Sequence, residues 1–284
     1  LRFFVDESVR RLRTTRKGIC YKGDNKKIMA RIFITGSADG LGQMAAKLLV
    51  SQGHTVVLHA RNAERGREAL GKVPGAEKVL TADLSSMEET KLLAAEANEL
   101  GRFDAIIHNA GVYHSTSRDH SPDGLPLLFA VNSMAPYILT SLIQRPERLV
   151  YLSSGMHMQG NPRLEALTFE TIRAGHSPTY SDTKLYDLIL CKAVARKWPD
   201  VYANAVDPGW VPTKMGGRNA PDNLEKGYET QAWLAVSDDS GAKVSGRYFF
   251  HQKDRLYLRA ADDVAVQEQF LALCARLSGV RFTP

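Results

Sequence analysis

The sequence lacks the features of a membrane-spanning or secreted protein. No apolar run reaches the roughly 20 residues that a transmembrane helix needs, and no basic start is followed by an apolar core and a cleavage site. Cysteine is scarce, and Cys20, Cys191 and Cys274 show neither CxxC nor metal-ligand spacing. We therefore expect a protein of the reducing cytoplasm, with no membrane association and no bound metal.

The excess of positive charge is confined to the start of the chain. The formal net charge is +6, and residues 1–28 hold nine Lys/Arg against three acidic residues, which accounts for all of it. The remainder is neutral, so it lacks the basic surface that nucleic-acid binding needs. We expect residues 1–28 to be a disordered tail derived from a vector or an over-extended reading frame, with Met29 as the natural start. A genuine basic tail is the alternative.

Apolar and helical segments alternate from residue 30 onward, without repeats or low-complexity linkers. The 284 residues suffice for one large domain. The alternation predicts an α/β fold for residues 29–284, a doubly wound parallel sheet with helices on both faces. We expect strands at 30–35, 55–59, 78–81, 105–108, 149–153, 202–206 and 247–251, and helices at 43–53, 63–70, 86–100, 127–143, 179–198, 228–236 and 263–277.

The first strand runs directly into a glycine turn that precedes a helix. Gly36, Gly40 and Gly42 form G-x-x-x-G-x-G, which differs from the G-x-G-x-x-G of the standard dinucleotide fingerprint. Backbone N–H groups and the positive end of the helix dipole favour an anion at such a turn. The pattern therefore predicts a phosphate-binding turn at the carboxyl edge of the sheet, where ligands of such folds bind.

A tyrosine and a lysine stand four residues apart on an expected helix. Tyr180 and Lys184 therefore share one helix face. A phenol has a pKa near ~10, and a neighbouring ammonium group lowers that pKa toward the neutral range by favouring the phenolate. The pair is suited to proton transfer, although by itself the spacing is more often that of a surface pair or a half-buried tyrosine.

Considered together, the motifs resemble those of the classical short-chain dehydrogenase/reductase family over nearly all of residues 30–260. Asn109-Ala110-Gly111 follows His108, where the family usually has asparagine. The other matching residues, in chain order, are Thr35, Gly36, Gly40, Leu41, Gly42, Asp83, Leu84, Asn132, Ser154, Tyr180, Lys184, Pro208, Gly209 and Thr213.

The resemblance implies a catalytic tetrad of Asn132, Ser154, Tyr180 and Lys184. Tyr180 would exchange a proton with the substrate oxygen, and Ser154 would hydrogen-bond that oxygen. Lys184 would bind the nicotinamide ribose and lower the tyrosine pKa. Asn132 would hold a water that links Lys184 to solvent. The remaining matching residues, with Tyr180 and Lys184, would contact the cofactor.

The end of the second strand bears on the choice between NADP(H) and NAD(H). Members of the family that prefer NAD carry an acid there, which binds the ribose 2′-hydroxyl. Here Ala60 takes that place and Arg61 follows, and an arginine can pair with a 2′-phosphate. A solvated surface arginine is the alternative, and Asp39 in the glycine turn is a conflicting sign. We expect NADP(H), with Arg61 among its ligands.

The segment after Ser154 resembles a longer insert found in retinol-dehydrogenase-like and WW-domain-oxidoreductase-like members. Ser154 and Tyr180 are 26 residues apart, and His157 within the insert reads as a polar loop residue rather than a catalytic one. The glycine- and proline-punctuated stretch 214–224 suits a substrate lid. Side chains that could line an apolar substrate pocket are Met156, Met158, Tyr186, Trp210 and Met215.

The sequence thus predicts an oxidoreductase that transfers a hydride between NADP(H) and a small carbonyl or alcohol substrate. A non-catalytic NAD(P)-binding sensor on the same fold is the alternative, and an epimerase or dehydratase of the extended branch is disfavoured by the glycine spacing. Family members often form homodimers or homotetramers, and we expect one of these assemblies here.

Overall fold

The computed structural model describes residues 29–113, 119–164, 168–173 and 176–284, so the expectation for residues 1–28 lies outside it. Its centre is one sheet in the order β3-β2-β1-β4-β5-β6-β7-β8. All neighbouring strands pair in parallel except β7 and β8. The strands are β1 (Arg31–Ile34), β2 (Thr55–Ala60), β3 (Lys78–Thr81), β4 (Ala105–His108), β5 (Arg148–Leu152), β6 (Tyr202–Asp207), β7 (Tyr248–Phe250) and β8 (Lys253–Asp254). The predicted doubly wound sheet is confirmed.

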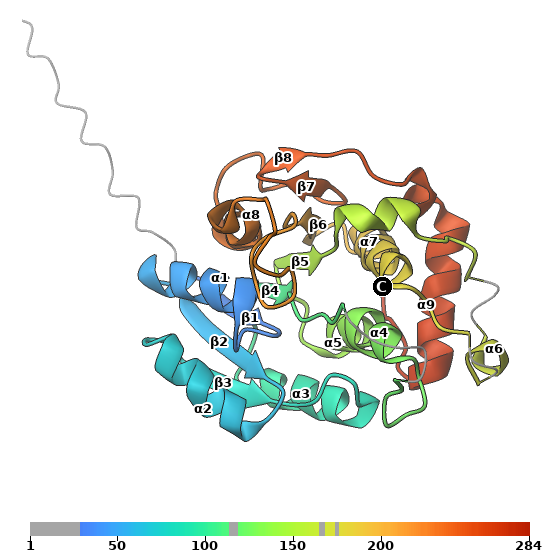
Figure 1. Ribbon diagram of the computed structural model, residues 1–284, viewed down its shortest axis with the longest axis horizontal. Helices are drawn as coiled ribbons and strands as arrows, with labels where there is room; N and C mark the ends of the chain where they lie inside the picture. Colours follow the sequence, from blue (N-terminus) through green and yellow to red (C-terminus); the bar gives the residue numbers. More distant parts are fainter. Residues whose placement is uncertain (1–28, 114–118, 165–167, 174–175) are drawn as a thin grey trace, which may run out of the picture.

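Helices cover both faces of the sheet (Figure 1). Helices α1 and α8 pack together on one face, where α2 also covers β2 and β3, whereas the pairs α3–α5 and α7–α9 pack on the other. The helices are α1 (Gly40–Ser51), α2 (Ala63–Lys72), α3 (Met87–Glu99), α4 (Leu127–Phe129), α5 (Ala135–Leu142), α6 (Phe169–Arg173), α7 (Tyr180–Lys197), α8 (Leu224–Val236) and α9 (Val264–Ser278). Among the described residues, none of these helices is long and apolar enough to cross a membrane.

Burial on both faces explains why the strands read as continuous apolar runs. In β1, Phe33 belongs to the core beneath α3 and α5, and Ile32 and Ile34 belong to the core beneath α1 and α8. All three side chains are fully buried. Because successive strand residues point to opposite faces, a strand covered on both sides needs apolar residues at every position.

The expected helix at 127–143 is interrupted, which corrects the sequence-based prediction. Its middle forms a π-helical turn, η1 (Ala130–Met134), between α4 and α5. Pro136 has no N–H group, so it cannot donate to the carbonyl of Asn132 four residues earlier. A second correction concerns α8, which begins at Leu224 rather than Tyr228 because the side chain of Asn223 caps its first turn.

Candidate active site

The glycine turn after β1 packs directly against the loop that follows β4. Gly36 and Gly40 have φ angles of +63° and +56°, a region that glycine adopts without strain. A Cβ on Gly36 would lie 2.8 Å from the Cα of Ala110, and one on Gly42 would lie 2.3 Å from Nδ2 of Asn109. That amide donates to the carbonyl of Gly36 at 3.1 Å. Gly36 and Gly42 are therefore required by the contact between the turn and the loop after β4, and Gly40 by its positive φ angle.

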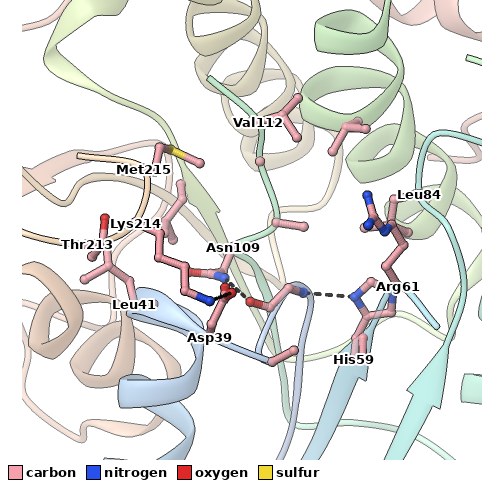
Figure 2. A pocket seen from close by; sticks show the side chains of 18 of the residues that line it. Asp39, Leu41, His59, Arg61, Leu84, Asn109, Val112, Thr213, Lys214 and Met215 are labelled. Carbon is pink, nitrogen blue, oxygen red and sulfur yellow. Dashed lines mark hydrogen bonds and ion pairs between the residues drawn. The ribbon is translucent and has the colours of Figure 1, made fainter. Parts of the chain in front are cut away.

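Two buried side chains brace this turn from behind. The hydroxyl oxygen of Thr35 accepts a hydrogen bond from the backbone N–H of Asn109 at 3.0 Å. Nδ1 of His59 accepts from the N–H of Gly36 at 2.9 Å, and its Nε2 lies 3.0 Å from the carbonyl of Ala82 (Figure 2). Burial lowers the pKa of His59 to about 4, so the ring is neutral at pH 7. No motif in the sequence marks His59 as part of the site.

A cleft of about 480 Å³ extends from the glycine turn across the carboxyl edge of the sheet. Thr35 and Gly42 lie behind its wall, and Gly209 lines the neighbouring cavity instead. The predicted cofactor residues that do line the cleft are Gly36, Gly40, Leu41, Arg61, Asp83, Leu84, Asn109, Ala110, Gly111, Tyr180, Lys184, Pro208 and Thr213.

The cleft fits a dinucleotide at the start of α1. Asp39 occupies the N-cap position but makes no side-chain capping hydrogen bond, so the side chain does not occupy the first-turn N–H groups. A Cβ on Gly40 would meet nothing within 4 Å, which leaves open space beside the turn. A pyrophosphate at this helix N-terminus would receive backbone N–H groups and the helix dipole.

Two cations contact Asp39 at one end of the cleft, and a third, Arg61, lines the cleft farther away. Arg65 on α2 pairs with the Asp39 carboxylate at 2.5 Å, and Nζ of Lys214 lies 3.4 Å from the same oxygen. Figure 2 shows Lys214 reaching Asp39, with Arg61 near Leu84 across the pocket. The negative charge of Asp39, which the sequence presented as a conflicting sign, is thus balanced by two cations.

Two of the predicted cofactor residues, Asp83 and Leu84, lie just after β3. Oδ1 of Asp83 accepts two hydrogen bonds from Ser85. The backbone N–H of Ser85 donates at 2.9 Å and its hydroxyl donates at 2.8 Å. Leu84 is buried, and both residues line the cleft. The turn therefore holds Asp83 in place without using its second carboxylate oxygen.

Helix α7 presents the predicted tyrosine and lysine. A capping box fixes its start, because Thr179 accepts from the N–H of Asp182 and the Asp182 carboxylate accepts from the N–H of Thr179. Tyr180 is the first helical residue, and Nζ of Lys184 lies 5.7 Å from its ring centre. Ser154, at the end of β5, is close enough that its hydrogen bond lowers the pKa of Tyr180. The structure therefore brings Ser154, Tyr180 and Lys184 together.

The net pKa shift of Tyr180 is opposite to the prediction. Burial of the phenol raises its pKa and is the largest effect, whereas Lys184 and the hydrogen bond to Ser154 lower it. The negative charge of Asp187 adds to the upward shift, and the resulting pKa lies above the usual value. The lysine acts in the expected sense, but the desolvation of the phenolate outweighs it.

Asp187 is a residue of the site that the sequence analysis missed. Nζ of Lys184 donates to the Asp187 carboxylate at 2.8 Å and to the carbonyl of Leu152 at 2.7 Å. Both charged side chains are buried. Burial disfavours the ammonium group and is the largest single effect, but Asp187 and Tyr180 together more than offset it, and the pKa of Lys184 is raised. An acid one turn after the lysine, within an otherwise apolar helix segment, was the signal available in the sequence.

Asn132 lies in the π-helical turn and is fully buried. Its Nδ2 donates to the carbonyl of Val112 at 2.9 Å and to the hydroxyl of Thr183 at 3.0 Å, and its Oδ1 accepts from the N–H of Val112 at 2.8 Å. The side chain therefore joins α7 to the chain after β4, and it lines neither cavity. Its main-chain carbonyl is the one that Pro136 leaves without an i+4 donor.

A second cavity, of about 830 Å³, adjoins the cleft and is lined by Ser154, Tyr180 and an apolar set. Met156, Trp210 and Met215 line it as expected. Tyr186 does not, because it is buried in the core against Phe270, with ring centres 5.6 Å apart. Met158 is half exposed and also lies outside the cavity lining.

The segment after β6 closes one side of both cavities. Nε1 of Trp210 donates to the carbonyl of Gly216 at 2.7 Å, and the N–H of Trp210 donates to Asp222 at 2.6 Å. Pro208 and Thr213 line the cleft and the second cavity alike. The loop 210–217 therefore lies where it could contact a molecule in the cleft and a molecule in the second cavity.

Two histidines near the motifs are buried and make hydrogen bonds within the protein. His157 is buried, which corrects the expectation of a polar loop residue. Its Nδ1 lies 2.7 Å from the carbonyl of Ser154 and its Nε2 accepts from the N–H of Leu258 at 3.2 Å. Burial lowers the pKa of His157. His108 is buried beside Thr140, and burial lowers its pKa to about 3. Neither histidine lines the cleft or the second cavity.

Known proteins resemble this chain in sequence and in fold. The model of the short chain dehydrogenase family matches residues 30–161. The chain is 46% identical over 257 residues to an uncharacterized oxidoreductase of Emericella nidulans, which covers 89% of this chain and 98% of the relative. It is 28% identical to mouse retinol dehydrogenase 14 over 289 residues, covering 88% and 86% of the two chains. A crystal structure from Mycobacterium paratuberculosis has the same fold, with a TM-score of 0.75, 24% identity and coverage of 90% and 95%.

The chain therefore belongs to the classical short-chain dehydrogenase/reductase family, and it is an oxidoreductase with an NAD(P)-binding Rossmann fold. Within that family it falls in the retinol-dehydrogenase-like subgroup.

Proposed function

We propose that this protein reduces carbonyl groups, or oxidises the corresponding alcohols, with NADP(H) as cofactor and Tyr180 as the general acid/base. The observation that supports this most is that Tyr180 lines both the cleft and the second cavity. A proton donor at this junction is adjacent both to a cofactor in the cleft and to a substrate in the second cavity. The bound cofactor supplies or accepts the hydride.

The hydroxyl groups of Tyr180 and Ser154 both interact with the substrate oxygen. Because burial raises the pKa of Tyr180, the phenol is protonated at neutral pH and can give its proton to a carbonyl oxygen during reduction. Ser154 hydrogen-bonds the same oxygen and stabilises the charge that develops on it.

Lys184 and Asn132 connect the phenol to solvent. Lys184 lies at the cleft wall, where it can bind ribose hydroxyls and replace the proton that Tyr180 gives up. The side chain of Asn132 is committed to Val112 and Thr183, so we assign the water-holding role to its main-chain carbonyl.

The remaining cleft residues hold the cofactor. The turn from Gly36 to Gly42 receives the pyrophosphate, braced from behind by Thr35. Asp83 and Leu84 border the adenine. The nicotinamide end lies between Asn109-Ala110-Gly111 and the segment Pro208, Gly209 and Thr213.

NADP(H) is the preferred form because the ribose end of the cleft carries positive charge. Ala60 is buried at the end of β2, so no acid faces the ribose 2′-position there. Arg61 lines the cleft, and Arg65 balances Asp39. A 2′-phosphate beside Arg61 would gain a charge-assisted pair.

The direct test is an assay of aldehydes, ketones and quinones by loss of NADPH absorbance, with NADH in parallel. We expect turnover with NADPH and slower turnover at equal NADH concentration. Tight cofactor binding without turnover of any of these compounds would favour a non-catalytic sensor instead. The expected homodimer or homotetramer stays a prediction, to be checked by light scattering.

A further inference from the structure

An arginine stands in the wall of the substrate cavity. Arg255 follows β8 and lines the same 830 Å³ space as Ser154 and Tyr180. Its Nη1 donates to Oδ2 of Asp207 at 2.6 Å, and its guanidinium lies 4.3 Å from the ring centre of Phe250. Among the residues that the structure describes, Asp207 is the only hydrogen-bond acceptor for this guanidinium. The other guanidinium N–H groups are therefore available to a ligand.

Asp207 fixes the position of this arginine. It is buried at the carboxyl end of β6, and its second oxygen accepts from the N–H of Gly209 at 2.9 Å. A Cβ on Gly155 would lie 3.1 Å from Oδ2 of Asp207. The guanidinium is thus held beside the segment that directly follows Ser154, and the Asp207 carboxylate has no oxygen left that lacks a protein donor.

The other charged side chains of the cavity are engaged elsewhere. Asp222 accepts from the N–H of Trp210 at 2.6 Å, and the largely exposed Lys214 lies 3.4 Å from Asp39 in the adjoining cleft. Apolar side chains supply much of the remaining wall. Arg255 is thus the cavity cation whose orientation is fixed by a buried acid, and it stands beside apolar side chains. A guanidinium held in this way is suited to select a ligand that carries an anionic group.

We infer that Arg255 binds a carboxylate of the substrate, so that the enzyme acts on oxo acids or hydroxy acids. This inference rests on the proposed function of the same site. A planar carboxylate can accept hydrogen bonds from a guanidinium, and Asp207 keeps that guanidinium oriented before the ligand arrives. The carbonyl of the substrate would then face Ser154 and Tyr180, and the carboxylate would lie against Arg255.

The test compares an aryl oxo acid with its neutral ester. Benzoylformate and methyl benzoylformate are assayed for kcat/KM with NADPH, and their dissociation constants are measured by calorimetry on the NADP⁺-loaded protein. The variants are Arg255→Gln and Arg255→Lys, with Arg259→Ala as a matched control. Arg259 is a nearby exposed arginine that does not line the cavity. Thermal unfolding verifies that each variant is folded.

We expect the wild type to bind and reduce the acid better than the ester. Arg255→Gln should lower affinity and kcat/KM for the acid by about 10- to 100-fold, the range for losing a charge-assisted hydrogen bond, and should leave the ester almost unchanged. Arg255→Lys should keep part of the preference, and Arg259→Ala should keep all of it.

The outcomes separate this inference from the proposed function. Preferential binding of the acid without turnover of either compound would support the role of Arg255 and contradict the reductase activity. Turnover of both compounds with an acid-to-ester ratio unaffected by Arg255→Gln would overturn the inference and leave the reductase intact. A wild type that shows no measurable binding of the acid would also overturn it. A purely structural role would lower the unfolding temperature without changing the ratio.

Discussion

Replacing Asp187 with asparagine should make Tyr180, the proposed general acid/base, more acidic. The Asp187 carboxylate lies 2.8 Å from Nζ of Lys184, and both side chains are buried. The negative charge raises the pKa of Tyr180 and opposes the effect of the lysine. Asparagine keeps a hydrogen-bond acceptor for the lysine but removes this charge, so the pKa of Tyr180 should fall.

The size of the effect follows from the helix geometry. Tyr180 and Asp187 are seven residues apart on α7, which corresponds to roughly 10 Å along the axis. At an effective dielectric constant of ~20, two unit charges at that separation interact by about 1.7 kcal/mol, or roughly one pKa unit. The opposing interaction with Lys184 is larger, because its Nζ lies only 5.7 Å from the tyrosine ring centre.

The assay is the pH dependence of kcat for alcohol oxidation, in which the phenolate accepts the proton. We expect the rising limb of Asp187→Asn to move down by about one pH unit relative to wild type. Asp200→Asn is the control, because it removes a largely exposed carboxylate that lies beyond the C-terminal end of α7, far along the chain from Tyr180. A lower rate at every pH with an unmoved midpoint would refute the electrostatic role and leave Asp187 with a positioning role.

Three further predictions address the cofactor cleft and its stability. Arg61→Ala should weaken NADPH binding by about tenfold or more and NADH binding little, with the exposed Arg67→Ala on α2 as control; equal losses for both cofactors would argue against a phosphate contact. The pKa of His59 is about 4 in the folded protein and 6.5 when unfolded, so the unfolded state binds more protons between these values. The free energy of unfolding should therefore fall as the pH drops below 6.5, and His59 should account for about 2 kcal/mol of that loss at pH 5. Urea unfolding measures this loss, and the His59→Gln variant should lack the His59 contribution to it. Hydrogen exchange in segment 214–224 should slow when NADP⁺ and substrate are added, and an unchanged rate would contradict its predicted role as a lid.

Most of the fold and the residues at the centre of the site could be predicted from local sequence patterns. The strands at 78–81 and 105–108 have the predicted bounds, because apolar runs bounded by polar residues are short-range signals. Glycine spacing and the Tyr180–Lys184 pair are likewise local. The π-helical turn at 130–134 was not predicted, because the apolar run around it indicated one continuous helix at 127–143.

What the sequence did not reveal depends on contacts between distant segments. His59 on β2 accepts from the N–H of Gly36, which follows the neighbouring strand β1, and Asp207 binds Arg255 although 48 residues separate them. The sign of the Tyr180 pKa shift depends on how far tertiary packing buries the phenol. Tyr186 was predicted to line the substrate pocket because it is aromatic, but on α7 its side chain faces the core. None of these features has a fixed spacing that a pattern could detect.

The most direct test of the proposed mechanism is the Tyr180→Phe variant, assayed for carbonyl reduction and for NADPH affinity on the same sample. The substitution removes the phenolic hydroxyl and leaves the ring that lines both cavities. We predict that turnover falls by at least about 100-fold, the usual contribution of a general acid, while the NADPH dissociation constant changes little. Turnover close to that of the wild type would contradict the assignment of Tyr180 as the proton donor.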